Sequence, residues 1–255
     1  MNNILAIAHK ELKAYFASPI GYIVVAVFAL LMGFFFSAIL EIYVQQSVQM
    51  AQFGGAPQMN VNDQVIRPLM LNGSVMVLFV LPMITMRTYS EEKRSGTIEL
   101  LLTSPLTDFQ IVMGKFVGAM ALYAAMLAVT VIDMVLLFAW GNPEWAPVVG
   151  SYIGLLLMGG CFVAIGLFVS STTKNQVVAA VVTWAIFLML WVIDWISSSL
   201  QGPMQSIVQY LSFTNHFDDF SRGVIDTKHL VYYVSFIAFG LFLTMRSVDT
   251  ERWRG

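Results

Sequence analysis

The stretch IGYIVVAVFALLMGFFFSAIL, residues 20–40, carries no charged residue and is long enough to cross a lipid bilayer as a helix. A transmembrane helix needs about 20 apolar residues to cover roughly 30 Å of hydrocarbon. Because no water is present there to bond the backbone, a run of this length must be helical. The stretch therefore predicts an integral membrane protein built from helices.

Similar apolar runs recur along the chain, and its composition agrees with them. Of the 255 residues, 58% are hydrophobic and 11% are charged, whereas a soluble domain has about 25% charged residues. We therefore expect an all-α integral membrane protein with six transmembrane helices in a single domain, residues 1–255. The runs lie at about 20–40, 69–88, 111–139, 148–170, 177–197 and 230–246.

Several of these runs begin with residues that favour a helix start. Ser18 and Pro19 precede the first run, where a serine hydroxyl can accept a backbone N–H and a proline has none to leave unpaired. Thr107 and Gln110 have the spacing of a capping box before the third run. Pro82 lies inside the second run and is expected to kink it, because proline removes a backbone hydrogen bond.

The distribution of lysine and arginine predicts how the spans are oriented, because cytoplasmic loops are enriched in these residues. If the N-terminus lies inside, ten of the 13 Lys and Arg residues fall on the inner side and three on the outer side. We therefore expect both termini in the cytoplasm. The inner residues are Lys10, Lys13, Arg87, Lys93, Arg94, Lys115, Lys174, Arg246, Arg252 and Arg254, and the outer ones are Arg67, Arg222 and Lys228.

Three segments outside the spans have distinct characters. Residues 1–18 are expected to form an amphipathic helix at the membrane interface, and they lack the continuous apolar core of a cleaved signal peptide. Residues 41–68 are polar and are expected to be a flexible loop. Residues 198–229 are too apolar for a plain loop and too short of apolar residues for a span, which favours a short interfacial or re-entrant helical segment. The apolar side of the first helix carries Ile4, Leu5, Ala8, Leu12, Tyr15 and Phe16.

The chain lacks the sequence motifs of several classes of enzyme. It has no G-x-x-x-x-G-K-[ST] phosphate loop, no G-x-S-x-G, no H-E-x-x-H and no C-x-x-C. Lys115, in the sequence MGKF, is interpreted as an anchor at the inner membrane face. Cys161 is the one cysteine, so no intrachain disulfide forms, and no basic cluster favours nucleic acid. We predict no catalytic, cofactor-binding or metal-binding residue in this chain, and no nucleic-acid partner.

The sequence TNHFDDF leaves two alternatives open. His216, Asp218 and Asp219 offer side chains of the types that bind metals, but their spacing of i, i+2 and i+3 does not place a ligand pair on one face of a helix. An outer ion pair with Arg222 is the interpretation that fits better. The 16 methionines are scattered over most spans and favour core packing over a soft-metal pathway.

Two acidic residues lie within the predicted spans. Asp133 and Asp194 fall in the outer parts of the third and fifth runs, where they are either solvated at the interface or line a polar pathway. Small residues at four-residue spacing favour close helix packing, either within one chain or between two. These pairs are Gly114 with Gly118, and Gly150 with Gly154.

A compact charged element, EEKRSGTIELLLTSP at residues 91–105, lies between the second and third runs. Residues 91–94 are expected to form a solvated turn that Gly96 ends. Thr97 is expected to cap a short helix over 98–102, which Pro105 stops. Such an element is typical either of a docking site or of an interfacial loop that lays its leucines on the bilayer. It would present Ile98, Leu101 and Leu102 beside Glu99.

This part of the chain resembles the cytoplasmic signature of ABC-2 type transporter permeases. In that family an E-x-x-x-G-T-[IL]-E-x-L-L-x-[ST]-P run precedes a helix that begins near G-K. The order of segments resembles the family along the whole chain, and the tail HFDDFSRGVIDTKHLVYYVSFIAFGLFLTMRSVDTERW is similar to the branch of gliding-motility permeases and related auxiliary transport systems. The matching residues are Glu92, Gly96, Thr97, Ile98, Glu99, Leu101, Leu102, Ser104, Pro105, Gly114 and Lys115.

The resemblance implies the transmembrane permease subunit of an ATP-binding cassette transporter in the inner membrane of a bacterium. The permease would pair with itself or a close homologue. A separate ATPase subunit would bind ATP and Mg and drive it through residues 91–105, the coupling helix, while membrane lipid surrounds the spans. The branch also implies a membrane-anchored partner with a large periplasmic domain. The coupling residues implied are Glu91, Glu92, Gly96, Thr97, Ile98, Glu99, Leu101, Leu102 and Pro105.

In this family the second and fifth spans face the dimer axis, which implies candidates for a pathway or gate. Three functions then compete: an ATP-driven export permease, a membrane anchor that relays ATPase motion to a periplasmic partner without transport, and a stand-alone secondary transporter. The third would favour inverted repeats with broken helices, and the sequence shows none. The candidates are Pro82, Trp184, Trp191 and Asp194, together with Asp133.

Overall fold

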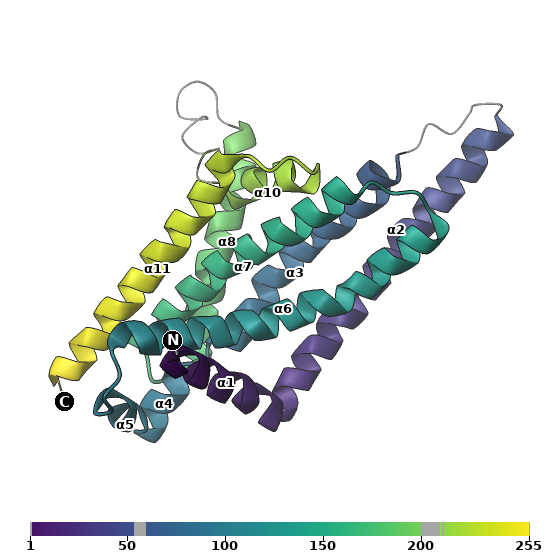
Figure 1. Cartoon of the computed structure of the whole chain (residues 1–255). Coiled ribbons are helices and arrows are strands. Elements are labelled where there is room, and N and C mark those ends of the chain that lie inside the picture. The colour runs from purple at the N-terminus through teal and green to yellow at the C-terminus, as the bar shows by residue number, and fades with distance from the viewer. Residues whose placement is uncertain (1, 54–59, 200–209, 211, 255) are drawn as a thin grey trace.

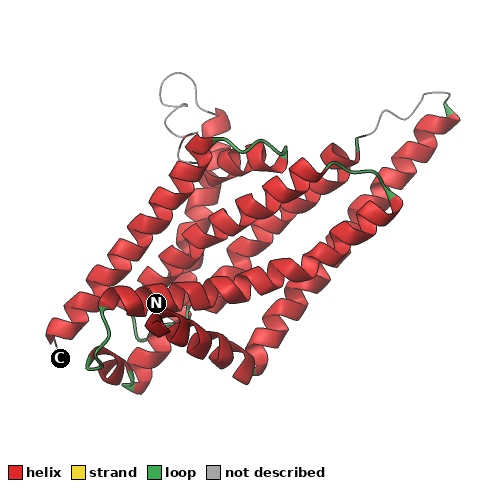
Figure 2. Cartoon of the chain, viewed as in Figure 1, coloured by secondary structure: helices red, strands yellow, loops and turns green. Residues whose placement is uncertain are grey.

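The computed structural model of the chain describes residues 2–53, 60–199, 210 and 212–254 (Figures 1 and 2). No strand occurs among these residues, which confirms the prediction of an all-α protein. The elements are α1 (Asn2–Ala17), α2 (Pro19–Gln52), the π-helical turn η1 (Asn62–Ile66), α3 (Arg67–Thr85), α4 (Ser90–Ser95), α5 (Ile98–Leu102), α6 (Asp108–Trp140), α7 (Trp145–Thr172), α8 (Gln176–Ser199), α10 (Phe213–Ser221) and α11 (Thr227–Arg254).

Six helical stretches in the described part of the chain are long and apolar enough to cross a membrane. Each overlaps one of the predicted runs, so the predicted number of spans is confirmed. Figure 1 shows α4 and α5 at one end of the bundle and α10 at the other. The stretches are Pro19–Gln52, Asn62–Ser95, Asp108–Trp140, Trp145–Thr172, Gln176–Ile193 and Thr227–Trp253.

The first spanning helix is longer than predicted. α2 has 34 residues, which is about 51 Å at 1.5 Å per residue and exceeds the roughly 30 Å of hydrocarbon in a bilayer. The expectation of a flexible loop over 41–68 is therefore wrong for residues 41–52, and also for residues 62–68, which form η1 and the start of α3. The reason is local: no glycine or proline lies between Gly33 and Gly54, and the Glu, Gln, Ala and Met residues there are good helix formers.

The predicted helix starts are present. The Ser18 hydroxyl accepts the Ile20 N–H at 3.4 Å. At the start of α6 the Thr107 hydroxyl accepts the Gln110 N–H at 3.3 Å, and the Gln110 side chain accepts the Thr107 N–H at 3.4 Å, which completes the capping box. Pro82 lies in the last turn of α3, which ends at Thr85.

α7 forms the centre of the bundle and packs against α3, α6, α8, α10 and α11. Its glycines allow this close packing. A Cβ atom at Gly159 would lie 2.1 Å from the Tyr123 ring of α6, and one at Gly166 would lie 2.2 Å from the Thr85 hydroxyl of α3. The Tyr123 hydroxyl then donates to the Leu155 carbonyl at 2.8 Å, so the same contact also satisfies a buried polar group.

The two glycine pairs singled out in the sequence serve contacts within this chain. Gly114 of α6 faces Ile7 of α1, where an added Cβ would lie 2.6 Å from the isoleucine Cβ. Gly118 faces Glu11 of α1 in the same way, at 2.8 Å. Gly150 and Gly154 of α7 receive Phe220 and Phe217 of α10. α1 and α10 are thus held on the long helices at opposite ends of the bundle.

The amphipathic first helix is also packed against protein. Ile7, Ala8 and Glu11 of α1 are buried, whereas Leu5 is 59% exposed. The buried side of α1 is therefore rotated relative to the predicted apolar side. This happens because Gly114 and Gly118 of α6 let Ile7 and Glu11 of α1 pack closely against them. This rotation places a carboxylate inside the protein.

Candidate functional site

The charged element between the second and third spans folds into a helical hairpin, α4–α5. Gly96 ends α4 with φ of 73°, a left-handed conformation that only glycine adopts readily. Residues 91–94 are helical, so the expectation of a solvated turn is wrong. Thr97 gives α5 no side-chain cap, contrary to prediction, because its hydroxyl hydrogen-bonds the Ser95 hydroxyl at 2.9 Å and the Glu92 carbonyl at 3.5 Å.

α4 is tied to the helices behind it by polar contacts. The backbone N–H groups of Tyr89 and Ser90 both donate to the Ser170 hydroxyl of α7, each at 3.1 Å. Lys93 is buried and forms an ion pair with Glu251 of α11. The hairpin therefore starts from a fixed base on α7 and α11.

A buried lysine forms the centre of a charge cluster at the base of the hairpin. Lys115 of α6 is 1% exposed. Its ammonium donates to Glu11 Oε1 of α1 at 2.9 Å and to the Thr88 carbonyl at 2.8 Å. It also forms an ion pair with Glu92 Oε2 of α4 at 2.8 Å. Three oxygens thus lie within 2.9 Å of the ammonium, two of them as hydrogen-bond acceptors, and α1, α4 and α6 converge on one nitrogen.

Lys10 of α1 balances the charge of this cluster. It donates to Glu92 Oε1 at 2.9 Å and lies 3.7 Å from Glu11, so two cations face two carboxylates. Partial burial lowers the pKa of Lys10, but its hydrogen bond and charge attraction to Glu92, and then to Glu11, outweigh burial and leave the pKa above its ordinary value. The cluster is held as neutralised ion pairs.

The interpretation of Lys115 as an anchor at the membrane face is therefore wrong. Sequence reasoning also missed Glu11. The sequence does carry a signal for this ion pair. Lys115 lies on the same side of α6 as the buried Val112, Ala119 and Leu122. Because a buried lysine needs a buried acid as its partner, this position predicts a carboxylate nearby.

A second ion pair closes the base of the hairpin from the other side. Arg252, near the C-terminal end of α11, lies 3.0 Å from Asp108 at the start of α6. The same guanidinium donates to the Leu106 carbonyl at 3.1 Å. The loop between α5 and α6 is thus attached to α11.

The outward surface of the hairpin differs from the predicted one. Ile98 is 8% exposed and Leu101 packs partly against the core, whereas Leu100 is 74% exposed. Glu99 and Pro105 are also exposed. The side chain of Leu102 lies outside the described residues. The exposed face of α5 is therefore built on Glu99 and Leu100.

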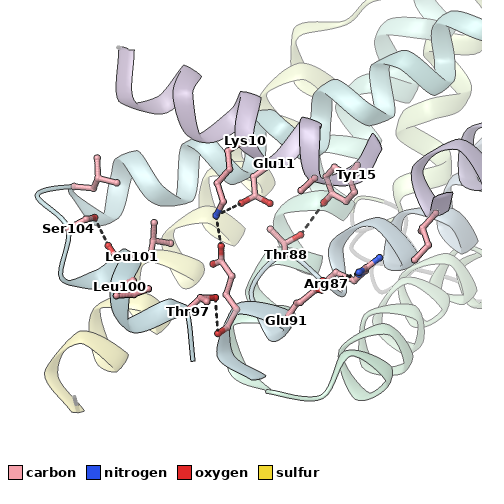
Figure 3. A pocket seen from close by; sticks show the side chains of 14 residues that line it. Lys10, Glu11, Tyr15, Arg87, Thr88, Glu91, Thr97, Leu100, Leu101 and Ser104 are labelled. Atoms are coloured by element: carbon pink, nitrogen blue, oxygen red, sulfur yellow. Dashed lines mark hydrogen bonds and ion pairs between the residues drawn. The ribbon is translucent and has the colours of Figure 1, made fainter. Parts of the chain in front are cut away.

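A cavity of about 610 Å³ opens between α1 and the hairpin. Figure 3 shows side chains of α1, among them Lys10 and Tyr15, across the cavity from Leu100 and Leu101 of α5. The Tyr15 hydroxyl donates to the Ile84 carbonyl at 3.1 Å and burial raises its pKa. The cavity has an apolar side and a charged side, directly beside the exposed face of α5.

The candidates for a pathway come from several helices. Pro82 is buried in α3, and Trp184 of α8 is 38% exposed, with its ring centroid 5.9 Å from that of Phe79 on α3. Trp191 lies further along α8 and is partly buried. Asp133 is partly exposed on α6, a helix that packs mainly on α1, α2, α7 and α11. The side chain of Asp194 lies outside the described residues.

At the other end of the bundle, Asp218 of TNHFDDF is paired with two arginines, whereas Asp219 is paired with His229. Asp218 lies 2.8 Å from Arg222, which confirms the predicted ion pair, and 2.5 Å from Arg67 at the start of α3. Among the residues that the structure describes, no group of three or more His, Cys, Asp and Glu side chains is arranged to hold a metal ion.

These features define a class of protein. Six apolar helices make the chain a multi-pass membrane protein, with a charged helical hairpin anchored at one end of the bundle. The chain belongs to the ABC-2 family of transporter proteins, whose sequence model matches residues 5–245.

Curated relatives agree with this assignment. The chain is similar to "Probable multidrug ABC transporter permease YbhR" of Escherichia coli strain K12 and of Escherichia coli O157:H7, with 26% identity over 203 residues in each case. The match covers 71% of this chain and 54% of each relative, so the chain spans about half the length of the curated relatives that it matches.

Proposed function

We propose that this chain is the transmembrane subunit of an ATP-driven transporter and that the α4–α5 hairpin receives motion from a separate ATPase subunit. ATP and Mg²⁺ bind to that subunit. The observation that carries the proposal is the attachment of the hairpin: α4 is joined by buried charge to α1 and α6 through Lys115, and to α11 through Lys93. A push on α5 therefore reaches three other elements at once.

The exposed face of α5 is the proposed contact with the ATPase. Leu100 is 74% exposed beside Glu99, on a five-residue helix that is too short to be stable alone. Contact with a partner buries this leucine and completes the packing of the helix. The cavity between α1 and the hairpin gives the ATPase a second place to insert a side chain.

The proposed function implies that two permease subunits form a dimer in a bacterial inner membrane. The hairpin end of the bundle then faces the cytoplasm, and α3 and α8 face a second permease. Support comes from exposed apolar residues on these two helices, Phe79, Met83 and Trp184, which are 50%, 47% and 38% exposed. The driven motion serves export or mechanical transmission across the membrane; the relatives' printed name is that of a probable multidrug transporter permease.

Co-purification tests the proposal. The tagged chain is co-expressed with the ATPase subunits of its own genome, and one of them is expected to co-purify. The double variant Glu99→Lys with Leu100→Asp is expected to lose that ATPase while reaching the membrane in wild-type amounts. Asn215→Asp, an exposed change at the other end of the bundle, is the control and keeps it. Retention of the ATPase by the double variant would refute the docking role of α5.

A vesicle assay separates export from mechanical transmission. The permease and its ATPase are reconstituted together, and ATP-dependent movement of drug-like dyes is measured. Accumulation that requires both subunits supports export. ATP hydrolysis without any movement of dye, in vesicles that hold the intact complex, favours transmission.

A further inference from the structure

Two buried histidines face each other at the end of the bundle opposite the hairpin. His216 of α10 and His229 of α11 are each 4% exposed, and their Nδ1 atoms lie 2.5 Å apart. His216 Nε2 lies 2.9 Å from the Tyr210 carbonyl oxygen. His229 Nε2 lies 2.7 Å from Asp219 Oδ2. The four residues form one continuous chain of hydrogen bonds, and the proposed function makes no use of it.

The chain of contacts determines where the protons are. A carbonyl oxygen only accepts hydrogen bonds, so His216 must carry its proton on Nε2 to bond Tyr210. If His216 is neutral, its Nδ1 has no proton and accepts from Nδ1–H of His229. His229 then needs a second proton on Nε2 to bond the Asp219 carboxylate. The arrangement therefore holds a neutral His216 and a charged His229 paired with Asp219.

A second proton on His216, at Nδ1, is incompatible with this geometry. Both Nδ1 atoms would then carry hydrogen at a separation of 2.5 Å, and two imidazolium cations would be in direct contact inside the protein. Burial, together with the nearby charges of His229 and Lys228, lowers the pKa of His216, although the Tyr210 carbonyl and Asp219 act in the opposite direction. His216 thus stays neutral while the contact is closed.

The other groups around His216 do not replace this contact. Its ring stacks on Tyr232 at 4.0 Å between centroids and meets Tyr210 and Tyr233 edge-on. On the same helix, Asp218 is occupied by Arg67 of α3 and by Arg222. From α7, the Cys161 thiol donates to the Tyr233 carbonyl. The direct polar link from the His216 ring to α11 runs through His229.

We propose that the Tyr210–His216–His229–Asp219 chain is a proton-binding latch that holds α10 on α11. It is closed while His216 is neutral, and it releases α10 when His216 takes up a proton. α10 is seated on Gly150 and Gly154 of α7 by the buried Phe217 and Phe220. A second polar link joins it to α11, because the Tyr233 hydroxyl donates to the Phe213 carbonyl at 3.0 Å. The latch is the link between the two helices that depends on a proton. Acidification on that side of the membrane changes the position of α10.

Nitrogen-15 NMR of the histidines tests the proton assignment directly. The chain has three histidines, and a His9→Gln variant removes the signals of the one outside the latch. Near pH 7.5 we expect one neutral ring with its proton on Nε2 and one fully protonated ring. Two neutral rings, or two charged rings, would overturn the assignment.

A distance measurement tests the release. Spin labels are placed at Asn215 of α10 and Val231 of α11, both exposed, in a Cys161→Ala background. We expect a single distance near pH 8 and a second, longer distance near pH 5, a pH chosen below the ordinary histidine pKa of about 6.5 because the pKa of His216 is itself lowered.

Matched variants keep this result interpretable. His216→Gln, which donates and accepts like a neutral imidazole, is expected to keep the short distance at both pH values. Lys174→Gln removes an exposed cation in the loop between α7 and α8, away from the latch, and should open as the wild type does. The latch is refuted if the wild type shows no second distance near pH 5. It is refuted equally if His216→Gln opens like the wild type.

Discussion

Lys115 of α6 and Glu11 of α1 are 104 residues apart in the sequence, and their side chains meet at 2.9 Å inside the protein. Glu92 of α4 contacts the same ammonium at 2.8 Å. One buried cation therefore joins the first helix, the hairpin and a spanning helix. A buried charge is costly unless it is paired, so this contact enforces the relative position of all three elements.

Replacement of the buried lysine by Lys115→Met should destabilise the protein by about 3–5 kcal/mol, because it leaves two carboxylates facing a single exposed lysine. The thermal unfolding transition in detergent provides the measurement. The double variant Lys115→Met with Glu11→Gln should recover part of the loss.

The control for this prediction is Lys10→Met. Lys10 belongs to the same cluster, but its side chain is 60% exposed, and an exposed ion pair contributes about 0–1 kcal/mol. Equal destabilisation by Lys10→Met and Lys115→Met would contradict the central role of the buried ammonium.

The glycine contact between α1 and α6 should not tolerate a larger residue. Gly114→Val would place a Cβ about 2.6 Å from the Ile7 Cβ, so α1 must move, at a cost of about 1–3 kcal/mol. Limited proteolysis of α1, followed on gels, should become faster. Gly33→Ala is the matched control: nothing lies within 4 Å of its added Cβ, and it should stabilise α2 by about 0.5–1 kcal/mol.

Two nearby apolar residues of α5, Ile98 and Leu100, should have different roles, one in folding and the other in ATPase docking. Ile98→Asp introduces a carboxylate at a buried site and should lower stability by roughly 3 kcal/mol. Leu100→Asp changes an exposed site and should alter stability by no more than about 0.5 kcal/mol, while it abolishes ATPase binding. Unfolding temperatures and co-purification, measured on the same samples, check both halves. A Leu100→Asp variant that unfolds early would show that the leucine is structural.

The pKa of His216 predicts how stability depends on pH. Burial lowers this pKa in the folded protein, so the unfolded chain takes up a proton first as pH falls. The stabilising effect is complete above the ordinary histidine pKa of about 6.5 and is lost as pH falls through the lower folded value. His216→Gln should therefore reduce the loss of unfolding temperature between pH 8 and pH 5. Parallel pH profiles for the variant and the wild type would contradict this.

Parts of the site were accessible from sequence because their causes are local. Gly96 ends a helix through its own conformational freedom, and Thr107 with Gln110 caps α6 across a single turn. The break at Gly96 and the short helix α5 between the second and third spans followed from such signals, whereas the helical form of α4 did not. Thr97 does not cap α5, because its hydroxyl hydrogen-bonds the Ser95 hydroxyl instead.

The outward face of α5 was not accessible in this way. Its five residues are too few to define an apolar stripe by periodicity, so the sequence predicts Ile98 on the outside and gives no signal for Leu100. The direction of each side chain is set by how the hairpin is attached to α7 and α11.

The sequence by itself determined that the chain is a helical membrane protein with six spans, because the bilayer imposes helix and length on any apolar run of about 20 residues. Only the tertiary structure decided which charges meet. Lys115 finds Glu11 and Glu92, and His216 finds His229, through contacts between helices that are far apart in the chain or separated by a turn. The hydrophobicity of each residue can be read along the chain. An ion pair or a shared proton, by contrast, depends on distances that exist only after the helices have packed.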